Sequence, residues 1–197
     1  MFGKNKKDSF IVYTVGAPVL KKVAQPVAVV NEEIRQLAKN MLAAMRIFNG
    51  IGLAAPQYGE SLRLVVFDVP MENSTGTPGE EYLLPRMPLT VINPEIVARS
   101  EQKIKRDEGC LSVPDVYAPV TRPASVVFRA QTLDGEFLEF ECGGLLGRCI
   151  QHELDHLDGF LFTDRLSPED ERNIRGDLNR LKSIGQSCNY RRISKKK

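Results

Sequence analysis

The chain has 197 residues, of which 42% are hydrophobic and 26% are charged, and its formal net charge is +2. These values favour one globular domain and exclude collagen-like, mucin-like and wholly disordered chains. No apolar run approaches the roughly 18 residues that a membrane helix needs, so we expect neither a membrane partner nor a secretory signal.

The first half of the chain predicts a short basic extension, residues 1–8, and then one helix. Asn31 is a good N-cap, and Glu32 and Glu33 follow it in the first turn, where the helix dipole favours negative charge. Apolar residues then recur with a helical period until Gly50, which predicts the end of the helix.

The middle of the chain predicts strands separated by turns. Strand-like runs cover residues 62–67, 89–92, 125–130 and 136–141. Asp134-Gly135 predicts a hairpin turn between the last two runs. Residues 70–88, rich in Pro, Gly, Ser and Glu, predict a surface insertion, as a flexible loop or as a lid over a substrate.

Two more helices follow. Residues 143–157 have a helical pattern, and a last helix is expected from the cap Ser167 to about Ile184. Without regular βα alternation, the chain predicts an α+β fold: short, mostly antiparallel strands around a central metal-binding helix, with an N-terminal and a C-terminal helix. We expect residues 9–166 to form the catalytic domain, and residues 167–197 a helix and a basic tail.

The tail holds most of the positive charge. Residues 190–197 carry +5 and residues 1–8 carry +2, so the part between them carries −5. We expect such ends to be disordered and solubilising, with a nucleic-acid handle as the alternative. The acidic body predicts no DNA binding.

The only two histidines, His152 and His156, stand four residues apart. On a helix they share one stripe with Cys149, and Glu153 falls within the apolar arc, where a carboxylate is costly unless a partner offsets it. Two imidazoles one turn apart can bind one metal ion, and a neighbouring glutamate can exchange protons with water. The pattern therefore predicts a catalytic metal site.

The third metal ligand stays open on the residues alone. Cys110 offers a thiolate, and the preceding Gly109 lets the backbone approach an ion closely. A zinc endopeptidase would instead use an acidic residue further on, and Glu169 or Glu171 is available. The four cysteines show no C-x-x-C spacing and predict no disulfide framework.

A glycine-rich segment, GIGLAAPQ at residues 50–57, follows the first helix. It predicts either a helix end with a tight turn or a surface on which a substrate backbone can lie. In the second case the amide of Gln57 could donate a hydrogen bond to a developing oxyanion.

Three segments in order, GIGLAAPQ (50–57), EGCLS (108–112) and QHELDHLDG (151–159), resemble the signatures of the peptide deformylase family. The resemblance covers about residues 15–164. It implies hydrolysis of the N-formyl group of N-formylmethionyl nascent polypeptides, with release of formate.

The resemblance also implies roles for single residues. Cys110, His152 and His156 would hold one divalent ion, Fe(II) first, with Ni, Co or Zn as substitutes. Glu153 would transfer protons, and the Gln57 amide and the Leu111 backbone N–H would stabilise the oxyanion. Substrate-binding residues would be Ile51, Gly52, Leu53, Gly109 and Cys149. Asp155 is expected to face away from the metal and to pair with Arg122.

The expected partners are N-formylmethionyl peptides and, through the basic tail, the ribosome. The expected compartment is the bacterial cytoplasm, with an organellar matrix or stroma as the alternative. Two rival functions remain: the zinc endopeptidase, and a non-catalytic module that holds a metal and binds peptide N-termini.

Overall fold

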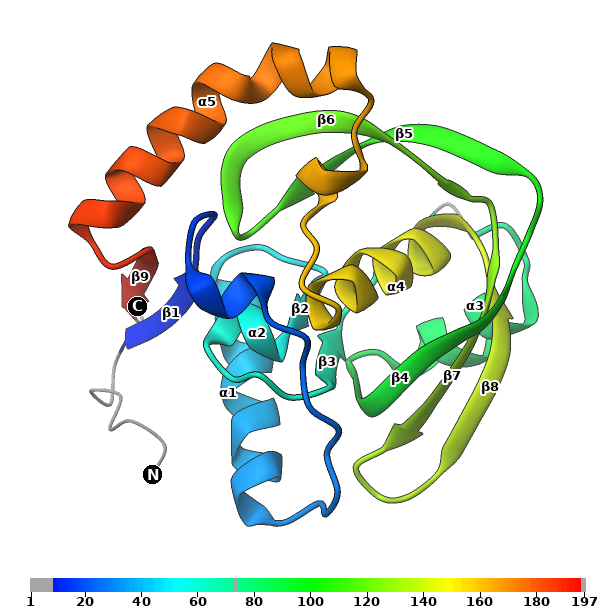
Figure 1. Ribbon diagram of the computed structural model, residues 1–197. Coiled ribbons are helices and arrows are strands. Elements are labelled where there is room, and N and C mark those ends of the chain that lie inside the picture. The colour runs from blue at the N-terminus through cyan, green and yellow to red at the C-terminus, as the bar shows by residue number, and fades with distance from the viewer. Residues whose placement is uncertain (1–8, 73, 196–197) are drawn as a thin grey trace.

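The computed structural model describes residues 9–72 and 74–195, and its centre is a five-stranded antiparallel sheet (Figure 1). Neighbouring strands follow the order β2-β3-β4-β7-β8. Their bounds are Gly52–Ala54 (β2), Leu64–Phe67 (β3), Leu89–Arg99 (β4), Val126–Thr132 (β7) and Phe137–Cys142 (β8). The predicted α+β class is confirmed, and Asp134 and Gly135 lie in the turn between β7 and β8.

Two helices cover opposite faces of the sheet. On β3, Val65 and Phe67 pack with the apolar side of α4 (Gly144–Leu157), whereas Leu64 and Val66 pack against α1 (Glu32–Ile47). Because side chains alternate along a strand, a strand between two helices is apolar throughout. The run LVVF of β3 therefore positions α4 against the middle of the molecule.

The helices begin and end close to their predicted bounds. The side chain of Asn31 accepts a hydrogen bond from the Ile34 N–H at the start of α1. The side chain of Ser167 does the same for Asp170 at the start of α5 (Pro168–Ser187). No helix of the described residues is long and apolar enough to cross a membrane.

A long hairpin that the sequence patterns missed lies on the other side of α4. It pairs β5 (Lys103–Cys110) with β6 (Val113–Pro123), and α5 and a short 3-10 helix (Phe162–Arg165) pack against it. Half of the side chains of β5 are exposed and only one is buried, so β5 carries charged residues and little apolar alternation. Figure 1 shows α4 between this hairpin and the sheet.

The strand expected at 89–92 is longer than predicted. Asn93 has a left-handed backbone (φ 49°) and Pro94 follows it, and the register with β7 shifts at this point before pairing resumes. A bulge of this kind hides the continuation of a strand from a period-two pattern. The Asn93 side chain also binds the backbone N–H and carbonyl of Val27.

The prediction of a flexible loop at 70–88 is wrong for about half of this segment. The segment contains α3 (Pro78–Leu83) and a 3-10 turn (Leu84–Arg86). Leu83 and Leu84 are buried in the core, and Tyr82 stacks on Phe140 of β8. Thr77 and Glu80 form a capping box, whose sequence signal T-x-x-E was present.

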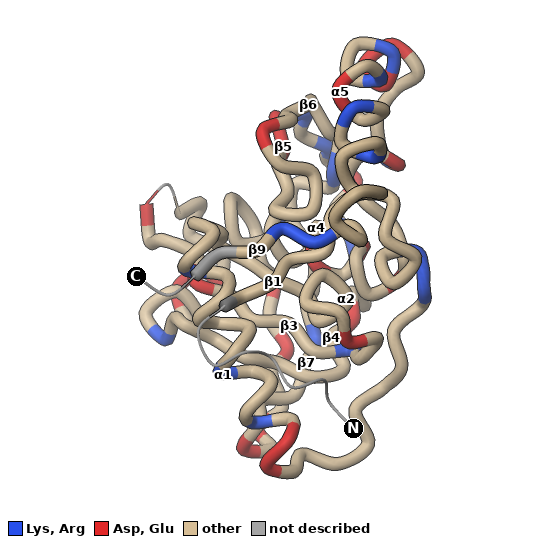
Figure 2. Tube along the Cα trace, turned by 90° about the vertical axis from the view of Figure 1, so that its left-hand side faces the viewer, with Lys and Arg blue, Asp and Glu red and all other residues tan. Residues whose placement is uncertain are grey.

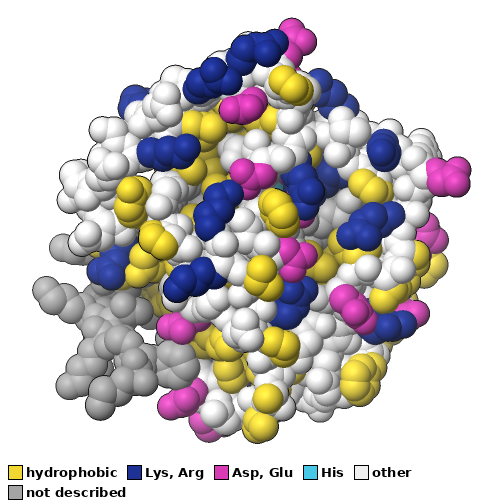
Figure 3. Space-filling view, in the orientation of Figure 1, with side chains coloured by type: hydrophobic (Ala, Val, Ile, Leu, Met, Phe, Trp, Pro, Cys, Tyr) yellow, Lys and Arg dark blue, Asp and Glu magenta, His cyan; other side chains and the backbone are white. Residues whose placement is uncertain are grey.

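The prediction of a disordered basic tail is also wrong for the described part. Arg191–Lys195 forms β9, which pairs antiparallel with β1 (Ser9–Tyr13). Residues 1–8 and 196–197 lie outside the described residues. On the face shown in Figure 3, basic and acidic side chains are interspersed and form no continuous basic field.

Candidate active site

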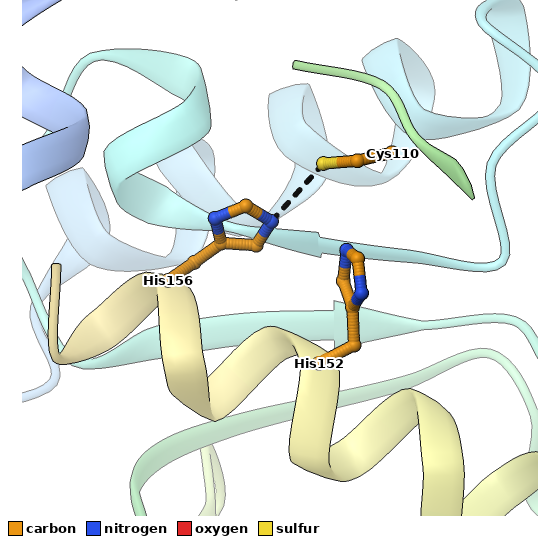
Figure 4. A group of neighbouring side chains, drawn as sticks. All are labelled: Cys110, His152 and His156. Carbon is orange, nitrogen blue, oxygen red and sulfur yellow. Dashed lines mark hydrogen bonds between the residues drawn. The ribbon is translucent and has the colours of Figure 1, made fainter. Parts of the chain in front are cut away.

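A cysteine and two histidines from distant parts of the chain meet beside α4. His152 and His156 project from successive turns of α4, and Cys110 ends β5 opposite them (Figure 4). The Cys110 Sγ lies 3.2 Å from the His156 Nε2, and one ligand atom from each of the three residues lies within 4.8 Å of the others. The structure thus brings together the three residues that the sequence singled out as ligands.

The local backbone explains the place of the thiol. Pairing of β5 with β6 shifts register after Gly109, so that the chain turns sharply between Cys110 and Val113. Within this turn the Ser112 N–H donates to the Cys110 Sγ at 3.4 Å. A backbone donor of this kind stabilises a thiolate, the form that binds metals.

This donor set fits a divalent metal ion. Ligand atoms that share one ion at bond lengths of about 2.0–2.3 Å stand about 3 to 4 Å apart. The 3.2 Å between Cys110 and His156 falls in this range, and all three ligand atoms lie within 4.8 Å of one another. Three protein ligands leave one position for water or substrate, as in catalytic sites. The acidic alternatives Glu169 and Glu171 are exposed on α5 and lie outside the cluster, so the endopeptidase ligand set is not assembled.

Behind His152 lies a buried ionic network centred on Glu108. Glu108 accepts from the Arg122 guanidinium at 2.6 and 2.9 Å and from Arg148 at 2.6 Å. Its other contact is the His152 Nδ1 at 3.0 Å, which leaves the His152 Nε2 free to point at the cluster. Burial raises the pKa of Glu108, but the His152 and Arg122 contacts outweigh it and lower this pKa to about 2.

The rear face of α4 completes that network. Asp155 accepts from Arg122 at 2.8 Å and from Arg165 at 2.6 Å, away from the metal cluster. The predicted Asp155–Arg122 pair is therefore confirmed. Arg122 links the two carboxylates and ties β6 to α4.

Glu153 is a second buried carboxylate next to His152, and it lies beside the cluster without arginine partners. It is 4% exposed, and its Oε2 has no hydrogen-bond partner among the described residues. Burial, only partly offset by His152, raises its pKa to about 7. A Cβ at Gly52 would stand 2.5 Å from the Glu153 Oε1, so only glycine leaves room for this carboxylate.

The Gln57 amide reaches the same place from α2 (Ala55–Tyr58). Its Oε1 accepts from the Ala54 N–H at 2.8 Å, which fixes the orientation of the amide. Its Nε2 then points to the Ser112 Oγ at 3.2 Å and to the Cys110 Sγ at 3.5 Å. The donor is thus held next to the proposed metal ligand.

These groups open into one cavity of about 460 Å³. Most of the predicted site residues line it, namely Ile51, Gly52, Gln57, Gly109, Cys110, Leu111, Cys149, His152 and Glu153. His156 lies beneath them and is 1% exposed. The prediction for the Leu53 side chain is wrong, because strand alternation turns it to the opposite face of β2, where it is buried against α1.

Several residues of the site have positions that no sequence pattern predicted. Glu108 and Ser112 lie within the EGCLS motif, and their positions two residues before and after Cys110 are a signal of shared location. Phe48 and Arg192 also line the cavity. No local pattern could place Arg192 there, because it arrives through the pairing of β9 with β1.

Comparison with known proteins agrees with this geometry. Residues 10–172 match the family model described as polypeptide deformylase. The chain is 44% identical over 163 residues to "Peptide deformylase 2" of Gloeobacter violaceus, covering 83% of this chain and 82% of that protein. It is 44% identical over 155 residues to a peptide deformylase of Dictyoglomus thermophilum, with coverages of 79% and 91%.

Solved structures agree as well. A peptide deformylase from Legionella pneumophila superposes with a TM-score of 0.74 at 35% identity, covering 89% of this chain and 96% of that one. One from Ehrlichia chaffeensis gives a TM-score of 0.77 at 35% identity, with coverages of 88% and 94%. The chain therefore belongs to the peptide deformylase family, whose members are metal-dependent hydrolases that remove N-formyl groups.

Proposed function

We propose residue roles and a metal for the deformylation of N-formylmethionyl peptides by this chain. The reaction consumes one water molecule, breaks the formyl C–N bond, and releases formate and a free amino terminus. The observation that carries the proposal is the cluster of Cys110, His152 and His156 beside a buried carboxylate, one oxygen of which has no partner among the described residues.

The three ligand residues would hold one divalent ion. Such an ion acts as a Lewis acid, which makes water more acidic and polarises a carbonyl oxygen. We place Fe(II) first because the motifs resemble a family that uses it, with Ni, Co or Zn as substitutes. Metal analysis of anaerobically purified protein tests this assignment, and zinc as the sole active metal would overturn it.

Glu153 would move the proton. Its Oε1 lies against the backbone of Gly52 and its Oε2 is free to bind water. We assign it to take a proton from the attacking water and to deliver a proton to the leaving amine nitrogen. Its desolvated setting and raised pKa suit a group that must both accept and release a proton.

The oxyanion that forms on the formyl oxygen would be held by the Gln57 Nε2 and the Leu111 backbone N–H. Both groups line the cavity next to Cys110. Because the Ala54 N–H fixes the Gln57 amide, this donor is already oriented before the substrate binds.

The substrate would lie extended between two walls of the cavity. Ile51 and Gly52 offer backbone groups for strand addition, and Gly109 provides the opposite wall. Cys149 and the His152 ring would border the methionine side chain. Burial raises the pKa of Cys149 well above its usual value, so its thiol stays neutral there.

Formate release from a formyl-methionyl tripeptide tests the reaction. Protein loaded with Fe(II) or Ni(II) should turn over, and Glu153→Ala should not. Glu171→Ala, at an exposed glutamate of α5, serves as the matched control and should match the wild type. Absence of turnover by folded, metal-loaded wild type would favour the non-catalytic binding module.

A second experiment tests the ligand set. Cys110→Ala should lose bound metal, whereas Cys188→Ala removes an exposed cysteine and should retain it. Unchanged metal content in Cys110→Ala would refute the assignment of this ligand.

We also propose contact with the ribosome through residues 190–197, and the bacterial cytoplasm, or an organellar matrix or stroma, as the compartment. The basic side chains of this segment would add electrostatic affinity for ribosomal RNA. Co-sedimentation with ribosomes should weaken with salt and after deletion of these residues. Equal sedimentation of the deleted chain would reject the contact.

A further inference from the structure

The C-terminal strand contributes a side chain to the cavity in which the peptide binds. In the β1–β9 ladder, Arg192 pairs with Val12, and Arg192 lines the cavity together with Phe48 at the end of α1. Figure 2 shows β9 beside β1 on the side of the molecule turned toward the viewer. The fold therefore uses the last strand to complete a wall of the cavity.

Phe48 holds the Arg192 guanidinium over its ring. The guanidinium carbon lies 5.1 Å from the ring centroid. Stacking of this kind limits the motion of an arginine but leaves its N–H groups free to donate in the ring plane. Arg192 is exposed, and this stacking gives its guanidinium a preferred position beside the cavity.

Unlike the other arginine that lines the cavity, Arg192 has no carboxylate partner among the described residues. The other lining cation, Arg148, is bound to Glu108 at 2.6 Å. Arg192 forms no ion pair with any carboxylate of residues 9–72 and 74–195. Its charge is therefore available to a ligand.

The exposed acidic side chains of the cavity lie on another wall. Asp107 and Asp115 belong to the β5–β6 hairpin and line the cavity, and both are exposed. A peptide between the two walls would meet a positive charge on the β9 side and negative charges on the hairpin side. Such a field selects the orientation and charge of substrate side chains.

The segment from Phe48 to Gly52 limits the distance between Phe48 and the reacting centre at Glu153. Gly52 contacts Glu153 at the reacting centre, and Phe48 precedes it by four residues. Four residues span at most about 14 Å, which is also the length of about four extended residues of a bound peptide. Phe48, on which Arg192 stacks, therefore lies no further from the reacting centre than about four extended residues of a bound peptide.

We propose that Arg192 is a specificity-determining residue that binds an acidic side chain within the first residues after the formylmethionine. The inference rests on the proposed function, since it takes formylated peptides as the ligands. Arg192 would act on substrate choice, and its charge plays no part in the proton transfer assigned to Glu153.

Three sets of formyl-methionyl tetrapeptides test the proposal, with Glu, Gln or Lys placed at the second, third or fourth residue. At one of these positions the wild type should show kcat/KM about two- to fivefold higher for Glu than for Gln, and lower for Lys, as expected for a solvent-accessible ion pair. The preference should reside in KM and decline as salt is raised.

Variants at two neighbouring arginines separate this contact from general charge. Arg192→Ala should remove the preference, and Arg192→Glu should invert it toward Lys. Arg191→Ala is the matched control, because Arg191 stacks on Tyr13 and does not line the cavity. It removes the same charge and should keep the wild-type preference.

The outcomes are distinguishable from failure of the reaction itself. Turnover of the Gln peptides establishes deformylation independently of Arg192. Equal kcat/KM for Glu, Gln and Lys at all three positions would refute the proposal, as would loss of the preference in Arg191→Ala as well as in Arg192→Ala. Thermal unfolding of each variant identifies any effect that comes from loss of the β1–β9 pairing.

Discussion

Two buried carboxylates on opposite sides of His152, Glu108 and Glu153, have opposite environments. On the network side, Glu108 is 6% exposed and is held by two arginines and the imidazole. On the cavity side, Glu153 is similarly buried but keeps an oxygen without a partner among the described residues. The pKa of the first falls to about 2 and that of the second rises to about 7.

This difference distinguishes a carboxylate that supports the site from one that takes part in the reaction. A carboxylate whose hydrogen bonds are all satisfied stays charged and fixes the groups around it. A carboxylate that is desolvated without a matching cation can exchange its proton, at a cost in stability. Here His152 stands between the two, so one side orients the proposed ligand and the other side carries the reaction.

The largest effect is expected from Glu153→Gln, which changes the carboxylate on the cavity side of His152 and leaves the Glu108 network intact. Turnover should fall by at least about 10²–10⁴-fold, because the amide cannot take the proton. Metal content should remain, and stability should not fall, because an unsatisfied charge has been removed. Formate release, metal analysis and denaturant unfolding measure the three quantities. Residual turnover within tenfold of wild type would contradict the role of Glu153.

Glu108→Gln breaks the network side. It leaves Arg122 and Arg148 without their central partner, and removing one member of a buried ion pair costs about 3–5 kcal/mol. Metal affinity should also fall by about 10–100-fold, because His152 loses the group that orients it. Urea unfolding and metal titration provide the readouts. A loss of turnover without loss of stability would show that Glu108 belongs with Glu153.

Asp155→Asn tests the outer edge of that network. Arg122 would still be held by Glu108, so the expected cost is about 1.5–3 kcal/mol, that of a charged hydrogen bond. Turnover should stay within a few-fold of wild type, since Asp155 faces away from the cluster. The comparison of unfolding midpoints with Glu108→Gln checks this order. A cost equal to that of Glu108→Gln would contradict it.

The smallest effect is expected at Glu80, a buried carboxylate whose hydrogen-bond partners, Thr75 and Thr77, are uncharged. Burial raises its pKa, but hydrogen bonds from Thr75 and Thr77 outweigh this and lower it from the usual 4.5. Its charge therefore stabilises the fold above about pH 4.5, and this contribution disappears as the pH falls through the lowered value. Glu80→Gln should cost about 1 kcal/mol at pH 7 and progressively less in acid. A cost that is constant between pH 7 and pH 3 would contradict this assignment.

Much of the fold near the site could be predicted from the sequence because it depends on local signals. Asn31 and Ser167 cap their helices through their own side chains, and the apolar stripes of α1 and α4 follow the helical period. The β5–β6 hairpin was missed because its exposed strand carries charges where alternation was sought. The helix α3 was missed because its short length gave less signal than the Pro and Gly around it.

The sequence by itself determined the pair His152 and His156 and the anomaly of Glu153, because a helix fixes the relative positions of residues one turn apart. It also supplied Cys110 and Gln57 through motifs that resemble a known family. Only the tertiary structure decided that Leu53 faces α1, that Glu108 holds His152, and that Arg192 enters the cavity. These facts depend on strand pairing and on packing between distant segments, for which the chain carries no local signal.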